Sequence, residues 1–143
     1  MPFASHGELK LWVENNIVFM EIAGGWNLEK AKEFTQTLNT QITALVKPPF
    51  GAIGILHDDW MPTADAIPHL QEATRRAIKA GLVKEAYVST SKLSSKVTQS
   101  LVLPKDCHDY QSKEFDNISD AVAWLLPSDA KPIQSLRDAC RCQ

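Results

Sequence analysis

The side chains best suited to chemistry stand together in one short segment, HDDWMPTAD, which begins at His57. An imidazole, two adjacent carboxylates and an indole follow directly after an apolar stretch. In open α/β sheets, ligands and partners bind beyond the carboxyl ends of the strands, where such a segment would lie. The candidate partner-binding or regulatory residues are therefore His57, Asp58, Asp59, Trp60, Thr63 and Asp65.

Two interpretations of this segment stay open. In the first, it is a recognition surface for another protein, and Trp60 is the aromatic anchor of a small hot spot. In the second, it is an ordinary polar turn, with Trp60 folded over the edge of the core and both aspartates in water. A related hypothesis makes Trp26 and Trp60 the mouth of an aromatic-lined pocket for a small apolar ligand or a lipid.

Metal, cofactor and catalytic sites find little support in the residue spacing. Adjacent side chains such as Cys107 and His108 point apart, and the pair Cys140 and Cys142 lacks a second pair of ligands. The hydroxyl-rich segment around Lys92 follows no glycine-rich phosphate loop, so we interpret it as helix capping. We expect no catalytic residue, no metal and no cofactor, and therefore no enzyme; the role of the two C-terminal cysteines stays open.

Composition narrows the classes of partner. The 143 residues are 44% hydrophobic and 22% charged, with a net charge of -2 and no long basic tract, which argues against nucleic-acid binding. No segment is apolar enough to span a bilayer, and the first residues do not resemble a signal peptide, so we expect a cytoplasmic protein. A modest basic face leaves weak peripheral contact with an anionic membrane open; its residues are Arg75, Arg76, Lys79 and Lys84.

The hydrophobic pattern predicts the elements that would position these residues. Alternation predicts a hairpin over 8–22, and short apolar runs predict strands at 50–56 and 85–89. Three- and four-residue spacing predicts helices at 28–45 and from 67 to Gly81, the second with Asp65 as its N-cap. A short helix carrying Leu93, Val97 and Leu101, a polar strand over 110–115 and a helix beginning after Ser119 complete the predicted set.

The order of these elements predicts the fold class. It is α/β, with a single mixed, mostly parallel five-stranded sheet and about four helices, in the order β-β-α-β-α-β-α-β-α. We expect one domain over 1–127, followed by a tail over 128–143 that is either loose or a short docked helix.

Three segments carry a resemblance to a known family. They are GGWNLEKAKEF after the hairpin, FGAIGILHDDWMPTADAIPHL, and EFDNISDAVAWLL near the end. Together they resemble the small bacterial STAS-like, anti-sigma-factor-antagonist-like proteins. The last segment is the most telling, because members often end with a strand, an acidic turn and a short helix closing on Trp-Leu, here Trp124 and Leu125.

The resemblance implies a sheet of four or five strands packed on helices. Our first hypothesis for the function is a non-enzymatic, regulatory module that binds a partner protein through the segment after the central strand, with a homodimer as one form. In the signalling members, a Ser or Thr at the start of the helix after the central strand is phosphorylated. The matching segment here departs from their Asp-Ser-Ser-Gly pattern, and Thr63 is its hydroxyl residue. Because of this departure, the resemblance does not decide whether Thr63 is phosphorylated.

Overall fold

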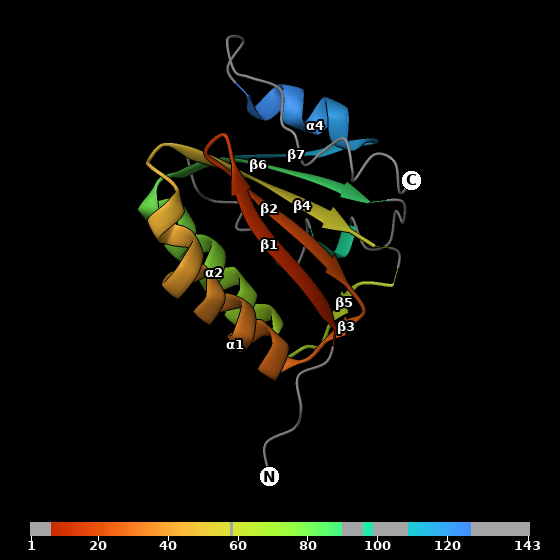
Figure 1. The fold of residues 1–143 in the computed structure, drawn as a ribbon. Helices are drawn as coiled ribbons and strands as arrows, with labels where there is room; N and C mark the ends of the chain where they lie inside the picture. The colour runs from red at the N-terminus through yellow and green to blue at the C-terminus, as the bar shows by residue number, and fades with distance from the viewer. Residues whose placement is uncertain (1–6, 58, 90–95, 99–108, 127–143) are drawn as a thin grey trace.

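The fold, a computed structural model, is described for residues 7–57, 59–89, 96–98 and 109–126 (Figure 1). Its strands are β1 (Glu8–Glu14), β2 (Ile17–Ala23), β3 (Gly25–Trp26), β4 (Phe50–Leu56), β5 (Met61–Pro62), β6 (Leu82–Ser89) and β7 (Gln111–Phe115). Its α-helices are α1 (Leu28–Thr37), α2 (Ile67–Ala80) and α4 (Ile118–Leu125). Among these residues, none of the helices has the length and apolar character needed to cross a membrane.

The main sheet has the mixed, mostly parallel character that the element order predicted. Its five strands follow the order β1-β2-β4-β6-β7. Only β1 and β2 are antiparallel, whereas β4 pairs in parallel with β2 on one side and with β6 on the other. The apolar strand after the first helix is therefore central, as expected of a strand that is covered on both faces.

Helices cover both faces of this sheet. In Figure 1, α1 and α2 lie side by side against one face, and α4 lies against the other. Successive side chains of β4 point to opposite faces of the sheet, so this strand needs cover on both. Ala52 and Leu56 pack toward α1 and α2. Ile53 and Ile55 belong to the core cluster that contains residues of α4. On the α4 face, Trp12 stacks on Phe19, with ring centroids 5.2 Å apart.

Some predicted boundaries were wrong. Strand β6 begins at Leu82 rather than Glu85, which places Glu85 inside the strand. Helix α4 is capped by Asn117 rather than Ser119, because the Asn117 side chain accepts a hydrogen bond from the backbone of Asp120. Three α-helices are described in place of about four, since the short helix expected after β6 is described only over 96–98. The tail over 128–143 lies outside the described residues.

The predicted helix over 28–45 is not continuous. Its N-cap is Asn27 as expected, but α1 ends at Thr37 and gives way to one π-helical turn, Leu38–Ile42, and one 3-10 turn, Thr43–Leu45. A π-helical turn contains more residues than an α-helical turn, and a 3-10 turn contains fewer, so Leu45 no longer lies on the side of the helix that packs on the sheet. Leu45, expected to be buried, is 63% exposed.

The start of α2 also differs from the prediction. The N-cap position is Ala66, without a side-chain cap, and Asp65 lies just before it. Ala66 is fully buried, so the chain enters the helix with this methyl group in the core and with Asp65 exposed. The carboxylate of Asp65 instead accepts a hydrogen bond of 2.6 Å from the Thr63 hydroxyl.

Candidate functional site

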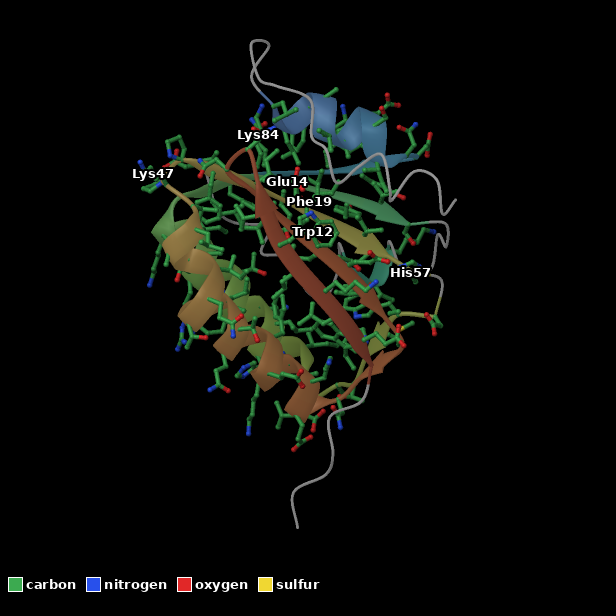
Figure 2. All side chains as sticks on the ribbon, viewed as in Figure 1. Trp12, Glu14, Phe19, Lys47, His57 and Lys84 are labelled. Atoms are coloured by element: carbon green, nitrogen blue, oxygen red, sulfur yellow. The ribbon has the colours of Figure 1, made fainter. Side chains whose placement is uncertain are left out.

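The predicted recognition segment lies at the carboxyl end of β4, as the sequence suggested. Figure 2 shows His57 at the opposite end of the sheet from Lys47. His57 is exposed, with its Nε2 atom 3.0 Å from Glu21 Oε1. The exposed Asp59 accepts a hydrogen bond of 3.2 Å from the backbone of Gly24. Asp58 lies outside the described residues.

Trp60 is not the surface anchor that the first hypothesis needs. Its side chain is 2% exposed and meets Trp26 edge-on, with ring centroids 6.1 Å apart. The cause is the short parallel pair β3–β5, in which Met61 donates to the carbonyl of Gly24 and Thr63 to that of Trp26. This pairing draws the segment back across the end of the sheet and turns the indole into the core.

The same packing brings Trp26 and Trp60 to a cavity between the main sheet and the helices α1 and α2. We call it the interior cavity because it lies between these layers, although it is partly open to solvent, with the exposed Arg76 in its lining. The cavity has a larger compartment of about 130 Å³ and a smaller one of about 60 Å³. Trp26 and Trp60 both line the smaller compartment. The larger compartment extends along the sheet toward the π-helical turn; its apolar lining includes Val18, Leu38, Ile42, Phe50, Ala52 and Ala77.

Four residues line both compartments and thus mark the boundary between them: Met20, Phe34, Thr74 and Glu85. Glu85 is the acidic member of this set, and it comes from the middle of β6. Sequence reasoning missed it, because the segment EAYVS was interpreted as a strand that starts at this residue. The sequence did contain a signal for Glu85: it is an acidic residue between Leu82 and Val88, within a segment that is typical of a buried strand.

The carboxyl group of Glu85 has an unusual environment. Tyr110, itself buried, donates a hydrogen bond of 2.5 Å from its hydroxyl to Glu85 Oε1. Burial raises the pKa of Glu85 above its ordinary value, and the hydrogen bond from Tyr110 opposes part of that rise. Glu85 is therefore a carboxyl group biased toward its neutral form within a mainly apolar wall.

Metal binding receives no support from the part of the chain that the structure describes. Within it, no three His, Cys, Asp or Glu side chains come together in a way that could hold a metal ion. The other residues considered for metal or anion chemistry, Lys92, Cys107, His108, Cys140 and Cys142, fall outside this part.

Comparison with solved structures identifies the fold. The chain matches the crystal structure of an uncharacterized protein of the DUF3478 family, with a SpoIIAA-like fold, from Shewanella loihica PV-4. The match covers 88% of this chain and 98% of that one, with a TM-score of 0.59 and 13% sequence identity. The fold is SpoIIAA-like. No family model matches the chain, and no curated protein matches it either.

The SpoIIAA-like fold agrees with the STAS-like resemblance noted in the sequence. At this level of identity, the comparison establishes the architecture alone. Within that architecture, the described residues offer two features for recognition. One is the exposed rim that follows β4, and the other is the interior cavity with the partly buried carboxyl group of Glu85.

Proposed function

We propose that this STAS-like domain binds a small apolar or amphipathic molecule in the interior cavity, without catalysing its conversion. The observation that carries the proposal is the cavity between the sheet and the helices α1 and α2, with about 130 Å³ in its larger compartment. Protein interiors are close-packed, and voids larger than a water molecule are few. An apolar cavity of roughly 150 Å³ is large enough to hold benzene.

The lining supports an apolar ligand in particular. Burial of apolar surface contributes roughly 25 cal/mol per Å² removed from water, so an apolar ring would be stabilised here by contact alone. Trp26, Trp60 and Phe34 add aromatic surface at the smaller compartment. Protein pockets for small molecules commonly combine such a lining with a few polar groups.

Native mass spectrometry of gently purified full-length protein tests this proposal. We expect a co-purifying molecule in the wild type and its loss in Ala77→Phe, which places a ring in the larger compartment. Ala123→Phe is the matched control, because Ala123 is exposed on α4, beyond the opposite face of the sheet. A bare mass for the wild type, together with no uptake of added small aromatic molecules, would contradict the proposal.

We also propose a second function, partner binding and regulation through the rim after β4, because one observation favours it. Met61 is 38% exposed, and Leu45 is the other large hydrophobic side chain that is exposed among the described residues. Exposed polar side chains surround Met61 in sequence; they are His57, Asp59, Thr63 and Asp65. An apolar side chain within a polar rim is a common arrangement at protein interfaces.

Pull-down with a Met61→Ser variant tests this second function, with Leu45→Ser as the control. Leu45 precedes β4 and Met61 follows it, so the two variants alter opposite ends of the strand. We expect Met61→Ser alone to lose a partner that the wild type retains. The contact between Thr63 and Asp65 argues against phosphorylation as the regulator, since a phosphoryl group on Thr63 would meet a like charge.

A further inference from the structure

We infer that Glu85 is the polar anchor of the interior cavity and donates a hydrogen bond to a carbonyl oxygen of the ligand. The ligand class is then a small, uncharged molecule that combines an apolar ring or short chain with one carbonyl group. This inference rests on the proposed binding function and specifies the chemistry of the same site.

The position of Glu85 is the first argument. Its side chain lines both compartments, so a ligand in either one reaches it. Tyr110 occupies Oε1 through its hydroxyl donor, which fixes the orientation of the carboxyl group. Oε2 is therefore the oxygen that we assign to the ligand.

The protonation state of Glu85 decides whether its Oε2 atom can donate a hydrogen bond or can only accept one. Burial disfavours the charged form of a carboxyl group, and the pKa of Glu85 is raised for this reason. A neutral carboxyl group has one O–H donor, whereas an ionised one only accepts. Because Oε1 accepts from Tyr110, we place the proton on Oε2, where it can be donated to a carbonyl oxygen.

The environment of Glu85 disfavours a cationic ligand. An ammonium group would require Glu85 to ionise within the apolar wall. Arg76, from α2, also lines the larger compartment, where its exposed guanidinium is paired with Glu72. The other titratable groups near Glu85 among the described residues are the phenols of Tyr87, in the smaller compartment, and Tyr110.

Two probes of matched shape test the inference by NMR titration of the full chain. Acetophenone has a ring and a carbonyl group, and α-methylstyrene has the same skeleton with a methylene group in place of the oxygen. A neutral hydrogen bond contributes about 0.5 to 1.5 kcal/mol, so we expect acetophenone to bind roughly twofold to tenfold more tightly. This preference should decline as the pH rises through the raised pKa of Glu85, because the carboxyl group then loses its donor.

Two variants separate the hydrogen bond from the shape of the cavity. Glu85→Gln keeps an N–H donor without a titrating group, so it should keep the preference and lose its pH dependence. Glu85→Leu should reverse the preference, because the carbonyl oxygen of acetophenone would leave water without finding a donor in the cavity. If Glu85→Leu fails to fold, the comparison of the wild type with Glu85→Gln across pH still decides the question.

The outcomes that overturn the inference differ from those that overturn the proposed function. Equal affinity for the two probes in the wild type, a preference that grows with pH, or tighter binding of benzylamine would exclude Glu85 as a donor while leaving the cavity function intact. Failure of both probes to bind would overturn the cavity function as well, since α-methylstyrene requires only the apolar lining.

Discussion

At the scale of single residues, Glu85 should make the stability of the domain depend on pH. Its pKa is raised by burial from the ordinary value of 4.5, so the folded state holds the proton more tightly than the unfolded chain. The free energy of unfolding should therefore fall as the pH rises from 4.5 to the raised pKa, and level off above it. Urea denaturation at a series of pH values measures this slope.

The variant Glu85→Gln should remove that slope and be more stable than the wild type above the raised pKa. Its amide oxygen can still accept from Tyr110, and it carries no charge. Glu8→Gln, a change of an exposed glutamate on β1, is the control and should leave the slope in place. A wild-type slope that survives in Glu85→Gln would show that other groups cause it.

Residue-scale chemistry was only partly predictable from the sequence. The place of His57 and Asp59 after the central strand was readable, because strand order fixes which end of the sheet they occupy. The sequence left the burial of Trp60 as one of two alternatives, because it depends on β3 and β5, two strands of two residues each that leave no hydrophobic pattern. The role of Glu85 depends on α1, α2 and Tyr110, which only the folded chain brings around it.

At the scale of elements, the turn between β1 and β2 is tied to the segment before β4. Asn15 and Asn16 both have positive φ, of 50° and 62°, as two-residue hairpin turns require. The Asn16 amide also donates to the carbonyls of Lys47 and Pro49, at 2.7 and 2.9 Å, and its oxygen accepts from the Lys47 backbone at 2.7 Å. The sequence signalled the turn but not this second role.

Asn16→Gly should therefore destabilise the protein although glycine suits the backbone. It loses three partly exposed hydrogen bonds, for which we expect a cost of about 1 to 3 kcal/mol in the free energy of unfolding. Asn15→Gly, at the other turn position, should cost less than about 1 kcal/mol. Chemical denaturation compares the two, and equal effects would show that the turn itself, rather than the bonds to 47–49, carries the stabilisation.

The end of α2 depends on the same 47–49 segment. Gly81 follows the helix with φ of 121°, and an added Cβ would lie 2.3 Å from Pro48 Cβ. Gly81→Ala should therefore lower the free energy of unfolding by about 2 kcal/mol or more, through backbone strain and a steric clash. In Gly54→Ala the new methyl group would meet its nearest neighbours at 3.8 Å, so this control should lose far less. Similar losses in thermal or urea unfolding would contradict the steric argument.

The elements also show where periodicity fails as a guide. The apolar stripe from Leu28 to Ile42 correctly predicted a helical segment that packs on the sheet. It could not show the π-helical turn at Leu38–Ile42, because Leu38, Ile42 and Leu45 follow one another in sequence at the same three- and four-residue steps as in a regular α-helix. The exposure of Leu45 follows from that turn.

At the scale of the whole molecule, the order of strands and helices was the most predictable property. Apolar runs identified β4 and β6, and right-handed crossovers then limit how parallel strands can be arranged. The interior cavity was suggested only as an alternative. Its volume depends on how side chains from several strands and helices fill one space, and small differences in packing decide whether such a space is filled or open.

The sheet order predicts how hydrogen exchange should vary across the molecule. The central strand β4 is hydrogen-bonded on both sides and is buried over most of its length, whereas β7 lies at an edge and is exposed over 111–114. We expect the amides of β4 to exchange only through global unfolding and those of β7 through openings of lower free energy. Denaturant-dependent native-state exchange, read by NMR, distinguishes the two regimes. If β7 were protected as strongly as β4, the edge would be covered in solution, as it would be in a dimer that pairs through this strand.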